Sequence, residues 1–288
     1  MKDFLISVEH ACNIDEKTIK ENNIQIAKMR FTVNGTDLMS DDKEFSSKKV
    51  AQFLREGADV KTSQINTFEA EEYLKGLLKQ GKDIIHISFS SAMSGTCNNF
   101  KMVAEKLNAE NDNKIVVVDS LCQAGGVGVL VKMLLDEIAL GKIADVYSAR
   151  DYVESVKLNV AHVFTVENLK FLARSGRVKA TTAFIGNLLQ IKPVLRVDDG
   201  GTMVTYRKAI GRKKAVKEIY NIMAETYNGQ SKHVIISESD CVDEAIELKN
   251  LILNKFSDLD VEIVELCPLV TAHGGPGSLA LFYTVNKR

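Results

Sequence analysis

The sequence predicts an α/β protein in which a parallel sheet sandwiched by helices is followed by a second, smaller mixed α/β domain. In the first half, short runs rich in Val and Ile alternate with helical patterns, and near-continuous apolar runs are typical of strands covered on both faces. The pattern changes after about Ala149, and residues 198–201 (Asp-Asp-Gly-Gly) suit the turn of an antiparallel hairpin. We therefore expect domains at residues 1–155 and 156–288.

The first-half elements follow from the spacing of apolar residues. Short apolar runs bounded by polar residues predict strands, and apolar residues three and four apart predict helices. Because ligands bind beyond the carboxyl ends of parallel strands, a site is expected near residues 90–96 and 119–120. The predicted strands are 4–8, 24–31, 84–89 and 115–118, and the predicted helices are 44–56, 68–79, 98–107 and 127–140.

The second half is predicted on the same grounds. Strands recur at shorter intervals here, and they are mixed with helices, as in a smaller domain that closes over the first. The predicted strands are 160–166, 191–197, 203–210, 234–237, 261–266 and 279–285, and the predicted helices are 168–174, 181–189, 212–227 and 242–256.

Two hydroxyl-rich segments indicate an anion site. The strand ending at Phe89 is followed by Ser90-Ser91-Ala92-Met93-Ser94-Gly95-Thr96, and residues 61–64 (Lys-Thr-Ser-Gln) precede the next predicted helix. Hydroxyls and free N–H groups at a helix N-terminus can hold a carboxylate or phosphate, and glycine permits close approach of the backbone. The alternative is that Ser94 only caps the helix expected near Cys97.

The order and spacing of six segments resemble those of the DegV-type lipid-binding proteins, a family that includes the fatty-acid-binding subunits of bacterial fatty acid kinase. The segments are residues 61–64 (KTSQ), 90–96 (SSAMSGT), 118–120 (VDS), 168–177 (NLKFLARSGR), 191–195 (IKPVL) and 273–277 (HGGPG).

The resemblance implies a function. It implies a DegV-like fold that binds a long-chain fatty acid non-covalently, with the acyl chain in an apolar tunnel between the domains. It further implies no catalytic residues, no cofactor other than the bound fatty acid, and presentation of that acid to a separate ATP-dependent fatty acid kinase, which makes an acyl phosphate.

The resemblance also implies roles for individual residues. Thr62 and Ser94 are expected to hydrogen-bond the carboxylate, because hydroxyls do so without the desolvation cost of a buried lysine. His273 is expected in a glycine-rich loop beside the head group, or else merely completes that loop. Arg177 is expected to dock the kinase, or else is a solvated charge. Supporting roles are expected for Ser63, Gly95 and Thr96.

The sequence departs from the family pattern at two places. Where such proteins have Asp-Ser after the first strand, this chain has Glu9-His10, and where they have an arginine after the hairpin it has Ile210, with Arg207 and Arg212 nearby. These departures concern the head-group surroundings and partner recognition, whereas the resemblance in fold does not depend on them.

Composition excludes several classes of protein. With 37 basic and 38 acidic residues, the net charge of −1 gives no reason to expect nucleic-acid binding. No stretch has the ~20 apolar residues of a membrane span, and the N-terminal apolar run is too short for a signal peptide, so a cytoplasmic location is expected. Five scattered cysteines without Cys-x-x-Cys indicate neither a disulfide framework nor a metal site.

Two alternative functions remain open. One is a serine-dependent hydrolase or acyltransferase that uses Ser94 with His273, although Gly-x-Ser-x-Gly is absent. The other is a phosphate-ester-binding protein, because hydroxyl-rich loops accept phosphate as well as carboxylate. Asp119 and Ser120 lack an assignable base, and His86, inside an apolar run, is expected to be a core histidine.

Overall fold

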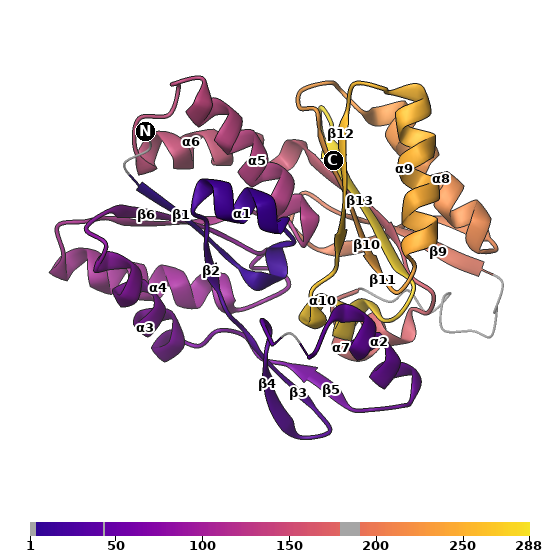
Figure 1. Ribbon diagram of the computed structural model, residues 1–288, viewed down its shortest axis with the longest axis horizontal. Helices are drawn as coiled ribbons and strands as arrows, with labels where there is room; N and C mark the ends of the chain where they lie inside the picture. The colour runs from indigo at the N-terminus through magenta and orange to yellow at the C-terminus, as the bar shows by residue number, and fades with distance from the viewer. Residues whose placement is uncertain (1–3, 43, 179–190) are drawn as a thin grey trace.

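The computed structural model describes residues 4–42, 44–178 and 191–288. These residues form a parallel sheet, a separate mixed sheet and a small antiparallel sheet (Figure 1). The predicted fold class is thereby confirmed. The helix predicted at 181–189 lies outside the described residues, and the domain boundary at 155/156 stays a prediction.

The first half of the chain forms a four-stranded parallel sheet in the order β2-β1-β6-β7. Helices α3 and α4 cover one face, and α1, α5 and α6 cover the other (Figure 1). Along β1, Phe4, Ile6 and Val8 join the core beside α5 and α6, whereas Leu5 joins the core beside α3 and α4, as the two-residue period of a strand requires. The elements are β1 (Phe4–Glu9), α1 (Glu16–Asn22), β2 (Gln25–Ala27), α3 (Thr67–Leu78), β6 (Asp83–Ser88), α4 (Thr96–Glu110), β7 (Ile115–Asp119), α5 (Gly125–Ala139) and α6 (Val146–Val156).

The second half forms a six-stranded sheet in the order β10-β9-β8-β13-β11-β12. Only β11 and β12 pair in parallel, and the other pairs are antiparallel. Helices α8 and α9 cover its outer face (Figure 1). The elements are β8 (Val160–Thr165), α7 (Lys170–Ser175), β9 (Ile191–Val197), β10 (Met203–Ile210), α8 (Arg212–Thr226), β11 (His233–Ser239), α9 (Val242–Lys255), β12 (Asp260–Glu265), α10 (Pro268–Gly274) and β13 (Ser278–Thr284).

Helix α5 joins the two large sheets. It contacts β6 of the parallel sheet and β8, β11 and β13 of the mixed sheet, and residues 125–134 are all buried. The stretch is apolar except for Lys132, which pairs with Asp15 and Glu262, and such a helix belongs in a core. Glycine makes the close approach possible, because a Cβ at Gly126 would lie 2.1 Å from His162 Nε2.

A third, three-stranded sheet was not predicted. The expected strand at 24–31 is wrong, because the chain leaves the parallel sheet at Ala27 and enters the small sheet at Arg30. This sheet has the order β4-β3-β5 and lies beside α2 (Figure 1). Its strands were missed because they are short and, in β4, mostly exposed. The elements are β3 (Arg30–Val33), β4 (Thr36–Met39), α2 (Ser47–Arg55) and β5 (Val60–Thr62).

Three α-helices were not predicted, namely α1, α6 and α10. The side chains of Asp15 and Asp145 cap the first two, and that of Asp145 accepts hydrogen bonds from the Tyr147 and Ser148 N–H groups. Helix α10 starts with Pro268 at its first position, where the fixed φ of proline suits a helix. Two short 3₁₀ helices, His10–Cys12 and Lys157–Asn159, follow β1 and α6.

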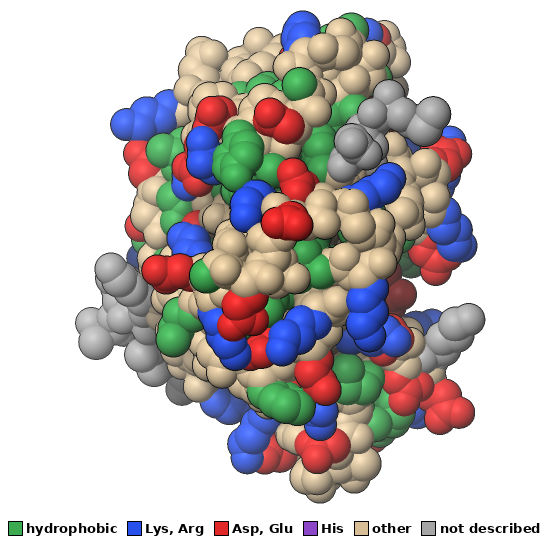
Figure 2. Space-filling view, turned by 90° about the vertical axis from the view of Figure 1, so that its left-hand side faces the viewer, with side chains coloured by type: hydrophobic (Ala, Val, Ile, Leu, Met, Phe, Trp, Pro, Cys, Tyr) green, Lys and Arg blue, Asp and Glu red, His purple; other side chains and the backbone are tan. Residues whose placement is uncertain are grey.

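The surface carries charges of both signs. On the face in Figure 2, acidic and basic side chains are interspersed. Among the surface charges, Glu71 of α3 pairs with both Lys75 and Lys106. Exposed pairs of this kind add little stability. Within residues 4–42, 44–178 and 191–288, no helix is long and apolar enough to cross a membrane.

Candidate functional site

A cavity of about 370 Å³ lies between the parallel sheet, β5, α10 and the mixed sheet. Its volume is within the roughly 300–1,000 Å³ common for small-molecule sites. Much of its wall is apolar and comes from both halves of the chain, including Phe89, Met93, Phe164, Leu172, Met203 and Phe282.

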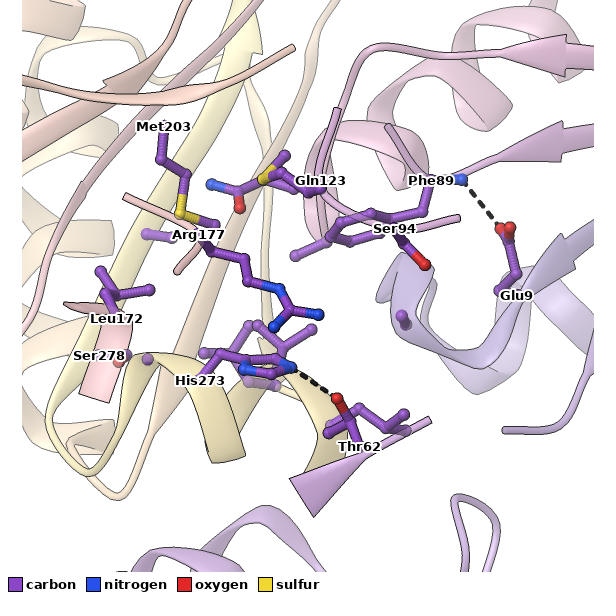
Figure 3. A pocket seen from close by; sticks show the side chains of 18 of the residues that line it. Glu9, Thr62, Phe89, Ser94, Gln123, Leu172, Arg177, Met203, His273 and Ser278 are labelled. Atoms are coloured by element: carbon purple, nitrogen blue, oxygen red, sulfur yellow. Dashed lines mark hydrogen bonds between the residues drawn. The ribbon is translucent and has the colours of Figure 1, made fainter. Parts of the chain in front are cut away.

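The structure brings the seven residues with predicted binding or docking roles to this cavity, whereas Asp119 and Ser120 do not line it. The seven residues come from separate places in the chain, namely the end of β5, the connection between β6 and α4, the residues after α7, and the end of α10. Figure 3 shows several of these side chains pointing toward one another. The residues are Thr62, Ser63, Ser94, Gly95, Thr96, Arg177 and His273.

The side chains of Thr62 and His273 form a hydrogen bond. The Thr62 Oγ1 and His273 Nε2 atoms are 2.8 Å apart (Figure 3). Thr62 ends β5, which pairs with β3 opposite Phe31, and His273 lies in the last turn of α10. The prediction of a loop position for His273 is wrong, because the glycine turn begins only after it, where Gly275 has φ +80°.

The His273 imidazole is held neutral. Burial, followed by the charges of Arg177 and Arg174, lowers its pKa from 6.5 to about 4. At neutral pH the ring therefore carries one proton, and one nitrogen donates while the other accepts. A negatively charged ligand beside the ring would raise the pKa of His273 again.

Ser94, Gly95 and Thr96 form the turn into α4. The Ser94 hydroxyl donates to Thr96 Oγ1 at 3.0 Å and accepts from the Thr96 N–H at 3.3 Å. The helix cap position is Gly95, which provides no side-chain cap, so Ser94 is not the cap residue. Thr96 Oγ1 in turn accepts from the Ile65 N–H at 3.1 Å, which ties this turn to the segment after Thr62.

Arg177 lies on the cavity wall. Figure 3 shows its guanidinium beside the His273 ring, and its Nη1 donates to the Ser175 carbonyl at 2.6 Å. No carboxylate among the described residues forms an ion pair with it. A positive charge without an acidic partner therefore faces the cavity. Kinase docking by Arg177 stays a prediction.

Glu9, one of the two departures from the family pattern, also lines the cavity. Its carboxylate accepts hydrogen bonds from the Ser88 hydroxyl and, at 3.0 Å, from the Phe89 N–H, and it lies 3.6 Å from His86 Nε2. Burial raises the pKa of Glu9, but the charge of His86 and these hydrogen bonds outweigh it, so the pKa is lowered. The carboxylate is thus stabilised by its own surroundings.

The other departure lies away from the cavity. Ile210 is exposed at the end of β10, Arg207 pairs with Glu218, and Arg212 pairs with Glu244.

No activated nucleophile is present at the described part of the site. Ser94 is hydrogen-bonded to Thr96, and His273 is hydrogen-bonded to Thr62. The hydrogen bond between a serine nucleophile and a histidine base that a hydrolase requires is therefore not formed. Asp119 accepts from the Ser91 and Leu121 N–H groups and shapes a turn. No cluster of described His, Cys, Asp and Glu side chains could hold a metal ion.

His86 is buried in the core, as expected. Its Nδ1 lies 2.9 Å from the Ser7 hydroxyl, and its ring stacks on Phe100 at 3.9 Å.

Several lining residues were missed from the sequence. Polar residues among them are Glu9, Gln64 and Gln123; Gln123 lies in the turn between β7 and α5, where the rule for parallel sheets could have indicated it. The apolar lining of β8, β10 and β13 gave no such signal, since periodicity identifies buried faces but not the ones that border a cavity.

The fold and the site define an α/β protein with a largely apolar ligand cavity in which hydroxyls, an imidazole and a guanidinium converge. The sequence model described as "Uncharacterised protein, DegV family" matches residues 3–286. A DegV domain-containing protein of Clostridium perfringens is 34% identical over 98% of both chains. The chain belongs to the DegV family.

Solved structures share the fold. A DegV lipid-binding protein of Thermotoga maritima has a TM-score of 0.86 at 23% identity and covers 100% of both chains. A fatty-acid-binding DegV protein of Thermus thermophilus has a TM-score of 0.85 at 22% identity over 99% of this chain and 100% of its own. The Fatty Acid Kinase B3 protein of Streptococcus pneumoniae, loaded with linoleic acid, has a TM-score of 0.85 at 19% identity over the same shares.

Proposed function

We propose that the protein binds one long-chain fatty acid non-covalently, with the carboxylate beside Thr62, Ser94 and His273. The observation that carries this proposal is the Arg177 guanidinium, which has no ion-pair partner among the described residues and faces a cavity with apolar walls. An ionised head group would supply the missing negative charge. With His273 Nε2 donating to Thr62 Oγ1, the Thr62 hydroxyl proton would be available to the head group, and the Ser94 hydroxyl would turn its proton from Thr96 toward it. Ser63, Gly95 and Thr96 hold this arrangement in place.

The apolar walls provide the affinity. Burial is worth ~0.8 kcal/mol per methylene, so a tail of about sixteen carbons gains roughly 12 kcal/mol before other terms. The loss of translational, rotational and conformational freedom on binding offsets about 4–15 kcal/mol of this gain. The hydrocarbon therefore supplies most of the driving force, and the polar groups set the orientation. A phosphate ester would meet the same polar groups, but only a lipid tail matches walls such as Phe164, Met203 and Phe282.

We infer a binding role and not a catalytic one. The bond between Thr62 and His273 leaves Ser94 without a base, and the lowered pKa of His273 makes it a weak general base at neutral pH. The resemblance to fatty acid kinase binding proteins supports presentation of the bound acid to a separate ATP-dependent kinase. In this proposal, the regions 1–155 and 156–288 enclose the lipid in the cytoplasm.

The experiment is a titration of delipidated protein with palmitic acid, followed by intact-mass measurement. Binding at micromolar concentrations with a mass equal to protein plus intact fatty acid, lost on denaturation, is the expected result. An ester adduct on Ser94 during turnover of an acyl substrate would identify the protein as a hydrolase and not as a binding protein. Failure to bind any fatty acid after repeated delipidation would reject the proposal.

A further inference from the structure

An unpartnered amide lies inside the otherwise apolar part of the cavity. Gln123 is 4% exposed and lines the cavity, and Figure 3 shows its amide reaching inward on the side of Met203, away from Thr62. Within the described ranges, no hydrogen-bonding partner of this amide is found. Its neighbours in the cavity wall include Ala124, Phe164 and Phe282.

The fold fixes the backbone at Gln123. The Gln123 N–H donates to His162 Nε2 at 3.1 Å, and His162 Nδ1 lies 3.0 Å from the Val160 carbonyl. Burial, followed by the charge of Arg288, lowers the pKa of His162 well below 6.5, so Nε2 stays an acceptor. The backbone on either side turns through positive φ at Leu121 (52°) and Ala124 (42°), a conformation that non-glycine residues rarely adopt.

An unsubstituted acyl chain would suit this amide poorly. A primary amide has two donors and one acceptor oxygen, and covering it with hydrocarbon removes water without replacing its hydrogen bonds. A hydroxyl on the chain can both accept from Nε2 and donate to Oε1. Sites built to hydrogen-bond a substrate hydroxyl discriminate against analogues that lack it.

We propose that Gln123 is a specificity-determining residue that hydrogen-bonds a hydroxyl group on the acyl chain, so that the preferred ligand is a hydroxy fatty acid. This inference rests on the proposed function and deepens it. Thr62, Ser94 and His273 surround the carboxylate, while Gln123 hydrogen-bonds the hydroxyl on the acyl chain.

The test compares stearic acid with a series of hydroxystearic acids in which the hydroxyl moves along the chain. Delipidated protein is titrated with each acid by calorimetry. At least one hydroxystearic acid should bind about ten-fold more tightly than stearic acid, which corresponds to about 1.4 kcal/mol. Gln123→Met should lose this preference and bind stearic acid at least as tightly as the unmodified protein. Gln52→Met is the control, because Gln52 lies on exposed α2 surface, bonded to Glu56.

The outcomes separate the two proposals. The unmodified protein could bind stearic acid and every hydroxystearic acid with equal affinity, a result that needs no variant. Water would then satisfy the Gln123 amide, and the inference about Gln123 would be overturned while the proposed function stood. An unchanged preference in Gln123→Met, or in Gln123→Leu should the first variant not fold, would assign the preference elsewhere. Binding of none of the acids would reject the proposed function itself.

Discussion

Replacing Thr62 with valine removes one cavity hydroxyl and keeps the branched shape of the side chain. The Thr62 hydroxyl is 2.8 Å from His273 Nε2 and is proposed to donate to the carboxylate. A hydrogen bond to a charged group is worth about 1.5–3 kcal/mol, which corresponds to a rise in Kd of about 10- to 150-fold. Because the acyl contacts are unchanged, this loss should be confined to ligands with an ionised head group.

The assay is calorimetric titration of delipidated Thr62→Val with palmitic acid and with its methyl ester. The acid should bind more weakly than to the unmodified protein, whereas the ester should change much less. Thr32→Val is the matched control, because Thr32 lies on the neighbouring strand β3 and does not line the cavity. An equal loss for acid and ester, or no loss for the acid, would refute the placement of the carboxylate at Thr62.

Three further predictions follow from the same geometry. Arg177→Met should weaken palmitic acid binding about ten-fold and reduce its salt dependence, whereas Arg150→Met, on α6 and away from the cavity, should change both little in the same titrations. The pKa of His273 is lowered from 6.5 to about 4, so the unfolded chain binds the proton first and stability should fall as pH drops from 6.5 toward 4, by up to about 3 kcal/mol. Denaturant titrations of His273→Gln should lack this component, and an identical pH dependence in both proteins would contradict it. Gly126→Ala should destabilise the protein, because its Cβ would lie 2.1 Å from His162 Nε2, whereas Gly76→Ala, with open space around it, should stabilise it by roughly 0.5–1 kcal/mol in the same titrations.

The sequence was sufficient for the elements whose signal is local. The strands of the parallel sheet carry dense Val and Ile runs, as at residues 84–87 and 115–118, and the structure places strands there. The long helices α4, α8 and α9 likewise have clear periodicity. Local signals failed where a short segment depends on partners distant in sequence: β5 is a strand because it pairs with β3, and α10 is too short for its periodicity to be recognised.

The candidate site was predicted only in part. Hydroxyls that follow a buried strand point to a site, and Thr62 and Ser94 do lie at the cavity. The hydrogen bond between Thr62 and His273 spans 211 residues, and no local pattern encodes such a contact. The same holds for Gln123, whose proposed role depends on what surrounds its amide and not on its neighbours in sequence.

The central claim, that the cavity holds a fatty acid, is tested most directly by the mass of gently purified protein. Under non-denaturing conditions, the mass should exceed that of the chain by one long-chain fatty acid, and under denaturing conditions that acid should be released intact. If it carries a hydroxyl, both proposals are supported together. Protein that shows only the mass of the chain, and that binds no added fatty acid, would contradict the account.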